Sequence, residues 1–267
     1  MSIFRLLLLT VGIWSTVALG QEPAPRSPTP EELFSEGTKL YQEGKFTDSA
    51  KKFEALARQQ PDKPELLLNW GLAEYQSGRR GMGVALWRRA LAISPSHMEA
   101  RRALDFATRA MQLREVEDSL WLERVRHDVL AHVALDQMLT VTLLLLATGG
   151  WLLLGYAGRR RKAMRQDLPL PPFSWAGTLL GVGFVFALGL TVLKAVEWSI
   201  PRATAVTITS VRTGPDNASS SLFELREGSD VILRQAKKGW TQIRYPGGMS
   251  GWVPNETLFQ TSGMPLW

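Results

Sequence analysis

The run MLTVTLLLLATGGWLLLGYAG, residues 138–158, carries no charged side chain and separates two polar parts of the chain. A helix of this length, at ~1.5 Å per residue, crosses the ~30 Å hydrocarbon core of a bilayer. A second apolar run begins at Trp175 and stays uncharged to Leu193, and it predicts a second span over residues 175–196. The two runs therefore predict a transmembrane hairpin of two helices.

The positive charge of the chain is concentrated between these runs, in residues 159–174. The net charge is +6, and this segment holds five cations against the single carboxylate of Asp167: Arg159, Arg160, Arg161, Lys162 and Arg165. Cations beside an apolar span favour the cytoplasmic side. We therefore expect a cytoplasmic loop, with both flanking parts outside the cytoplasm at a bacterial inner membrane. Because the charge lies in one loop, it does not indicate nucleic-acid binding.

Small residues recur within both runs. They are Gly177, Gly181, Gly183 and Ala187 in the second, and Gly149, Gly150 and Gly155 in the first. Small residues at such spacing let helices approach closely, which predicts a tight hairpin or a contact with another membrane protein. The alternative is that membrane helices simply tolerate glycine.

The amino-terminal segment resembles a targeting signal followed by a linker. Residues 1–20 combine Arg5, the apolar stretch 6–14 and the small-residue sequence 18–20, which predicts a signal peptide. An uncleaved anchor helix is the alternative. Residues 21–30 are rich in proline and predict an extended linker. The chain has no cysteine, so disulfides and thiolate sites are excluded.

An internal repeat follows the linker. Residues of the same type recur at a spacing of 34 positions, in the pairs Gly37 and Gly71, Tyr41 and Tyr75, Gly44 and Gly78, Phe53 and Trp87, and Pro61 and Pro95. This is the period of the tetratricopeptide repeat, in which each unit is a pair of antiparallel helices. The period predicts an all-α repeat domain over residues 31–116.

Two repeats leave an apolar edge, which requires a capping helix. Residues 98–113 have suitable apolar spacing, with Leu104, Phe106 and Ala107 expected to face inward. Residues 117–137 predict a further helix that either lies on the membrane surface or only connects the domain to the first span.

The character of the chain changes after Pro201. Short alternating runs separated by Gly and Pro turns predict five or six strands, the first over residues 205–211. A segment of this size with such strands predicts a small all-β barrel over residues 203–262.

No catalytic, metal or cofactor site is predicted. His127 and His132 are five residues apart, unlike helical metal-binding pairs, and surface histidines are the simpler interpretation of these two and of His97. Neither a phosphate-binding Gly-x4-Gly-Lys loop nor a Gly-x-Ser-x-Gly motif occurs. The sequence therefore favours a protein that is not an enzyme.

Two candidate binding surfaces remain. In the repeats, the helix positions that face a groove are Phe34, Thr38, Tyr41, Leu68, Leu72 and Tyr75. They predict contact with an apolar or aromatic protein surface, or else structural packing. In the barrel, Trp240 and Trp252 are candidates for binding a cell-wall peptide, or else core and rim aromatics.

Specific stretches resemble a known family. Residues 68–75 (LNWGLAEY), residues 78–95 with the ending WRRALAISP, and residues 100–107 (ARRALDFA) are similar to the repeat module of BatE-type proteins from bacterial aerotolerance operons. Residues 206–260, with the motifs Val211-Arg-x-Gly-Pro and Gly251-Trp-Val-Pro, resemble a bacterial SH3-like domain. Two positions depart from the family pattern: residues 79–83 (RRGMG) stand where small or acidic residues are usual, and Ala103 stands where Asn is usual.

The resemblance implies a role in oxygen tolerance or envelope stress. It also implies partners in the same membrane complex, namely von Willebrand A-domain proteins and a MoxR-type AAA ATPase system. Together these features predict a multidomain membrane protein: a tetratricopeptide domain, a transmembrane hairpin and an SH3-like barrel. The leading hypothesis is a membrane-anchored scaffold, and the alternative is a peptidoglycan-binding or wall-sensing protein.

Overall fold

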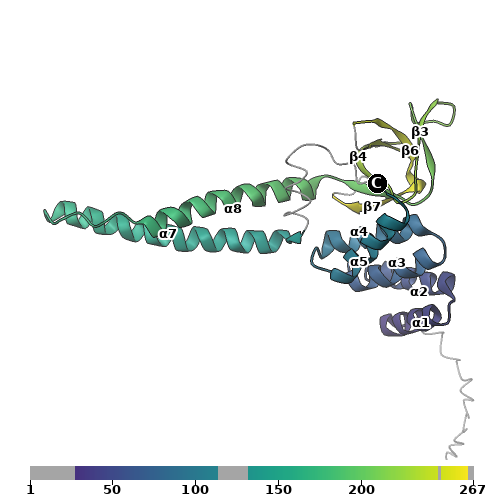
Figure 1. The fold of residues 1–267 in the computed structure, drawn as a ribbon, viewed down its shortest axis with the longest axis horizontal. Coiled ribbons are helices and arrows are strands. Elements are labelled where there is room, and N and C mark those ends of the chain that lie inside the picture. The colour runs from purple at the N-terminus through teal and green to yellow at the C-terminus, as the bar shows by residue number, and fades with distance from the viewer. Residues whose placement is uncertain (1–27, 114–131, 246–247, 264–267) are drawn as a thin grey trace, which may run out of the picture.

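The computed structural model describes residues 28–113, 132–245 and 248–263, which form a helical domain, a long helical hairpin and a β-sheet domain (Figure 1). The predicted signal peptide lies outside these residues, as do most of the predicted linker and of the helix expected over 117–137.

The helical domain consists of five short helices. They are α1 (Pro30–Gln42), α2 (Phe46–Gln59), α3 (Pro64–Gln76), α4 (Arg80–Ile93) and α5 (Met98–Ala110). A capping box starts α1, because Thr29 Oγ1 accepts the Glu32 N–H at 3.2 Å while Glu32 Oε2 accepts the Thr29 N–H at 2.8 Å. Gly44 and Gly78 adopt φ of 75° and 95° in the turns that follow α1 and α3. Glycine takes this backbone conformation without steric cost, which explains its recurrence.

The same contact joins the helices of each pair. A Cβ on Gly37 would lie 2.9 Å from a ring carbon of Phe53, and a Cβ on Gly71 would lie 2.5 Å from Trp87 Nε1. A large aromatic residue of the second helix thus occupies the space left by a glycine in the first. The predicted helical domain is confirmed, with equivalent contacts at the spacing of the sequence repeat.

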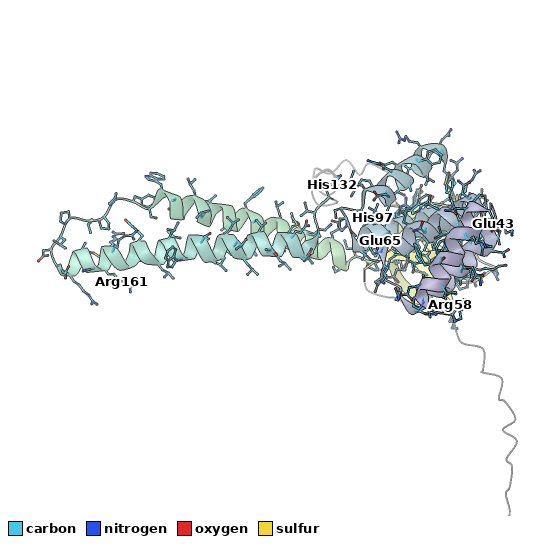
Figure 2. All side chains as sticks on the ribbon, turned by 90° about the horizontal axis from the view of Figure 1, so that it is seen from below. Glu43, Arg58, Glu65, His97, His132 and Arg161 are labelled. Atoms are coloured by element: carbon cyan, nitrogen blue, oxygen red, sulfur yellow. The ribbon has the colours of Figure 1, made fainter. Side chains whose placement is uncertain are left out.

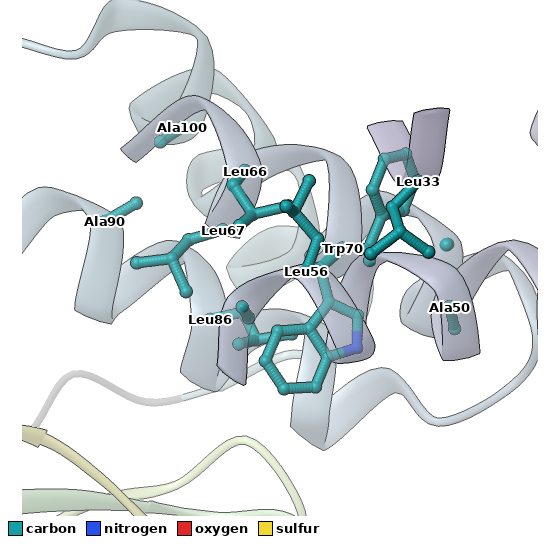
Figure 3. Close-up of a cluster of buried hydrophobic side chains, with 12 residues drawn as sticks. Leu33, Ala50, Leu56, Leu66, Leu67, Trp70, Leu86, Ala90 and Ala100 are labelled. Atoms are coloured by element: carbon teal, nitrogen blue, oxygen red, sulfur yellow. The ribbon is translucent and has the colours of Figure 1, made fainter. Parts of the chain in front are cut away.

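Leucine side chains and Trp70 fill the space between α1, α2, α3 and α4 (Figure 3). Trp70 Nε1 donates to Glu74 Oε1 at 2.8 Å, and the Arg79 guanidinium bonds both carboxylate oxygens at 2.6 and 2.8 Å. Glu74 is buried, and this burial raises the pKa of its carboxyl although both partners oppose the shift.

Two helices, α7 (Leu135–Arg165) and α8 (Trp175–Ser199), are long and apolar enough to cross a membrane. The five basic residues were predicted to lie in a loop, and this is wrong, because α7 continues past the predicted end of the span at residue 158 and holds them in its last turns. Arg, Lys, Ala and Met all favour helix, and the first residue that breaks a helix is Pro169. Figure 2 shows Arg161 at the end of the hairpin remote from the two domains and His132 at the end beside them.

The hairpin helices pack closely along part of their length. A Cβ on Gly149 would lie 3.1 Å from Leu180 Cβ, and one on Gly177 would lie 3.1 Å from Leu153 Cδ2. The buried hydroxyls of Thr142 and Thr191 are 2.9 Å apart. Gly150 and Gly183 face open space instead, so only some of the predicted small residues serve close packing.

The carboxy-terminal domain is a curled antiparallel sheet in the order β3-β2-β6-β5-β4-β1-β7. Its strands are β1 (Arg202–Ala205), β2 (Thr209–Arg212), β3 (Ser221–Leu225), β4 (Asp230–Lys237), β5 (Trp240–Arg244), β6 (Ser250–Pro254) and β7 (Leu258–Ser262), with a 3-10 helix at Asn255–Thr257. The strand predicted over 205–211 is in fact two, because the chain bends between Ala205 and Thr209. The core contains Val211, Leu225, Val231, Leu233, Ile243 and Val253.

Helix α4 packs directly on β1 and β7 (Figure 1). The Arg88 guanidinium donates to Thr204 Oγ1 at 2.8 Å and to the Gly228 carbonyl at 2.7 Å. Gly81 lies against the backbone of residues 205 and 206, where a Cβ would be 2.8 Å from the Val206 oxygen. The helical and β domains are therefore in direct contact, which the sequence did not predict.

Candidate functional site

The six predicted groove residues lie on α1 and α3. Phe34 is 39% exposed and meets Phe53 edge to face at 5.7 Å between ring centroids. The other five are half-buried: Thr38, Tyr41, Leu68, Leu72 and Tyr75. Leu68, Leu72 and Tyr75 pack on the buried cluster of Val84, Trp87 and Ala107. Most of these residues thus serve the core as well as the surface.

Phe106 of α5 extends this surface, contrary to its predicted inward position. Its side chain is 60% exposed and lies 6.3 Å from the Tyr75 ring, edge to face. The inward face of α5 carries Leu104 and Ala107, and a residue one position before Ala107 points about 100° away around the helix. Sequence periodicity alone could have identified Phe106 as exposed.

Arginine side chains lie beside the rings of Tyr75 and Phe106. The Arg80 guanidinium carbon lies 5.9 Å from the centroid of Tyr75. Arg102 and Arg109 are exposed on α5, four residues before and three after Phe106, and so neighbour it on the helix surface. We call Phe34, Tyr75 and Phe106, together with the arginines beside Tyr75 and Phe106, the aromatic face. It is suited to apolar side chains accompanied by carboxylates.

The sheet domain leaves the aromatic face uncovered. Its principal contacts are with α4, and Gly228 also lies against Met111 and Leu113 at the end of α5. The contact between the two domains leaves the side chains of Phe34 and Phe106 exposed.

The two tryptophans predicted for wall binding differ in exposure. Trp252 lies on β6 opposite Gln242 and Arg212 and is only 8% exposed, so its side chain is buried within the sheet domain. Trp240 is half-buried at the start of β5. Of the pair, Trp240 is the ring that a ligand can reach.

The predicted topology determinants are all exposed. Arg159, Arg160, Arg161, Lys162 and Arg165 form a basic end to α7, remote from both domains. Among the described residues, no group of three or more His, Asp or Glu side chains could hold a metal ion. His97 Nδ1 accepts the Ala100 N–H at 3.3 Å and so caps α5, while His132 is exposed and His127 lies outside the described residues.

Comparison with known proteins identifies one part of the chain. A family model described as a bacterial SH3 domain matches residues 207–259, which include β2 to β6 and the start of β7. No curated protein and no solved structure matches the chain. The predicted bacterial SH3-like domain is thereby confirmed, whereas the resemblance to BatE-type proteins and the tetratricopeptide assignment stay predictions.

Proposed function

We propose that the chain is a membrane-anchored scaffold that holds a partner protein on its helical domain. The aromatic face carries this proposal, because Phe34 and Phe106 stay exposed on a domain that already contacts the SH3 domain through α4. Exposed aromatic rings beside arginines are enriched where proteins bind one another. A tetratricopeptide-like module presenting such a surface would bind an apolar and acidic segment of its partner.

The hairpin supports the membrane part of the proposal. Helices α7 and α8 would span a bacterial cytoplasmic membrane, with the basic end of α7 in the cytoplasm and both domains outside. The His132 end and the Arg161 end of the hairpin lie far apart, which is compatible with opposite sides of a bilayer. Reporters fused after Arg114, within residues 159–172 and at the carboxy terminus should be extracytoplasmic, cytoplasmic and extracytoplasmic, in that order.

Co-purification from detergent tests the scaffold. The BatE-type resemblance suggests von Willebrand A-domain proteins and a MoxR-type ATPase system as the proteins to look for. Phe34→Asp with Phe106→Asp should release the partner, because each adds a carboxylate to an apolar contact. Leu222→Asp is the matched control, since Leu222 is 51% exposed on the SH3 domain. Equal loss of the partner in both variants would contradict the role of the aromatic face.

The second candidate function is binding of the cell wall. The match to a bacterial SH3 domain is compatible with it, and the accessible ring of Trp240 offers a contact. Sedimentation of the full chain with purified peptidoglycan, with Trp240→Ala as the variant, separates this function from the scaffold. Trp252→Ala is a poorer probe because it removes a buried side chain.

A further inference from the structure

The SH3 domain is joined to the end of α8 almost without a linker. Helix α8 ends at Ser199 and β1 begins at Arg202. The junction is held by backbone contacts, because Leu233 N–H donates to the Pro201 carbonyl at 2.9 Å and Gly263 packs against Pro201. Arg202 Nη1 also lies 3.2 Å from Asp230 Oδ2. The domain is therefore fixed to the helix end rather than free to swing.

Strand β4 runs from this junction back toward the α7–α8 hairpin. It is antiparallel to β1, with Thr204 opposite Asp230 and Arg202 opposite Ile232. Since β4 continues to Lys237, residues 233–237 extend beyond the start of β1, a path of about 16 Å at ~3.3 Å per residue. Figure 1 shows β4 on the side of the sheet nearest α8 and β3 on the far side.

The hairpin formed by β4 and β5 carries an excess of positive charge. Arg234, Lys237, Lys238 and Arg244 are all exposed, and within the described part of the chain none forms an ion pair or a side-chain hydrogen bond. One exposed carboxylate is nearby, because Glu256 follows Asn255, whose N–H binds the Gly239 carbonyl. Three positive charges thus remain uncompensated on this edge of the domain.

The tip of the hairpin places a lysine where another residue would be favoured. Lys238 and Gly239 have φ of 51° and 81°, as in a two-residue type I′ turn. Asparagine or glycine suits the first of these positions better than lysine does. Trp240 follows immediately, and tryptophan is enriched at the boundary between membrane and water.

We propose that the β4–β5 hairpin binds the headgroups of anionic phospholipids at the membrane surface beside α8. The inference rests on the proposed insertion of α7 and α8. It gives the tip lysines a ligand that the described chain does not supply, and it gives Trp240 an interfacial role. A cation near an anionic bilayer surface strengthens binding about fivefold, within a Debye length of ~10 Å.

The chain contains no cysteine, so single cysteines can carry fluorescent donors in the full-length protein. Ala236→Cys places a donor on the exposed β4–β5 hairpin, and Ala218→Cys places one on the turn between β2 and β3. The protein is reconstituted in phosphatidylcholine nanodiscs with a trace of acyl-labelled acceptor lipid, either phosphatidylglycerol or phosphatidylcholine. At low salt, energy transfer from position 236 should be severalfold greater to phosphatidylglycerol, with no such preference from position 218.

Lys237→Glu with Lys238→Glu should abolish the lipid preference at position 236, as should 0.5 M salt, where the Debye length is ~4 Å. Lys39→Glu with Lys51→Glu makes the same change of net charge on α1 and α2 and should leave the preference intact. Equal transfer to both lipids, or a preference that survives the hairpin substitutions, would overturn the inference. A donor at Val185→Cys on α8 reports whether the α7–α8 hairpin is inserted. Energy transfer from position 185 without a lipid preference at position 236 would reject only the proposed lipid binding by the β4–β5 hairpin. Absence of transfer from position 185 would reject the insertion of α7 and α8.

Discussion

Replacement of Gly81 with alanine has two opposing effects on the stability of the contact between α4 and the SH3 domain. In an isolated helix, alanine is up to about 1 kcal/mol more favourable than glycine. In the docked protein, however, the new Cβ would lie 2.8 Å from the Val206 oxygen, 2.9 Å from the Ala205 oxygen and 3.0 Å from Glu227 Cβ. Comfortable contacts of carbon are nearer 3.5 Å. Two of the three obstructing atoms belong to backbone, so α4 must move away from the strand.

Overpacking of this kind costs roughly 1–3 kcal/mol, which exceeds the gain in helix propensity. We expect Gly81→Ala to destabilise the docked state by about 1 kcal/mol, a factor of about five in its opening equilibrium. Hydrogen exchange of the backbone amides in α4 and β1, measured by mass spectrometry on the detergent-solubilised full chain, should accelerate accordingly. Exchange in α1 and in the remote part of α7 should not change.

Arg80→Ala in the same turn is the control, because Arg80 is exposed and its loss should change stability by no more than about 0.5 kcal/mol. If Gly81→Ala instead slowed exchange in α4 and raised the melting temperature, helix propensity would be the only effect present. The contact between α4 and β1 would then not exist in solution.

Three further substitutions test other contacts. Arg88→Met keeps the apolar stem but removes both hydrogen bonds to the SH3 domain, and it should cost about 3 kcal/mol in chemical denaturation; a loss below about 0.5 kcal/mol would contradict the docking. Glu74 has a raised pKa in the folded state, so its favourable contribution is present below the unfolded value near 4.5 and is lost as pH rises through the folded value. In calorimetry, the stability of Glu74→Gln relative to the unsubstituted chain should therefore be greater at pH 8 than at pH 4.5. An equal difference at both pH values would refute the raised pKa. Thr142→Val should weaken the hairpin by about 1 kcal/mol in a denaturing detergent titration, with little further loss on adding Thr191→Val, whereas additive losses would show that the two hydroxyls do not interact.

The helical pairs and the apolar helices could be predicted because each depends on local pattern. Gly37 and Gly71 recur because each leaves space for an aromatic side chain, Phe53 or Trp87, of the following helix. Long uncharged apolar runs likewise indicate helices that can cross a membrane. The basic residues were assigned to a loop because hydropathy indicates where a span leaves the lipid and not where its helix ends. Phe106 was misplaced because it stands next to Ala107 and two residues after Leu104, although its position on the helix is about 100° away from that of Ala107.

The contact between the domains could not be predicted from either domain alone. Gly81 and Arg88 are separated by more than a hundred positions from the backbone and the hydroxyl that they meet. The sequence nevertheless held a sign of it. Residues 79–83 depart from the expected repeat pattern, and Gly81 within them is where α4 touches the SH3 domain. A departure from a repeat thus marked a surface made for another part of the same chain.

This contact changes what the two domains can do together. Were they joined only through flexible segments, a partner held on the aromatic face would sample many heights above a membrane. Because α4 contacts β1, and only Ile200 and Pro201 separate β1 from the end of α8, direct contacts link the aromatic face, the SH3 domain and the α7–α8 hairpin. A rigid arrangement lowers the ordering cost of binding a partner that is itself anchored in the same bilayer. It also makes Arg88→Met informative about function: loss of partner binding without any change to the aromatic face would show that its placement, and not only its chemistry, holds the partner.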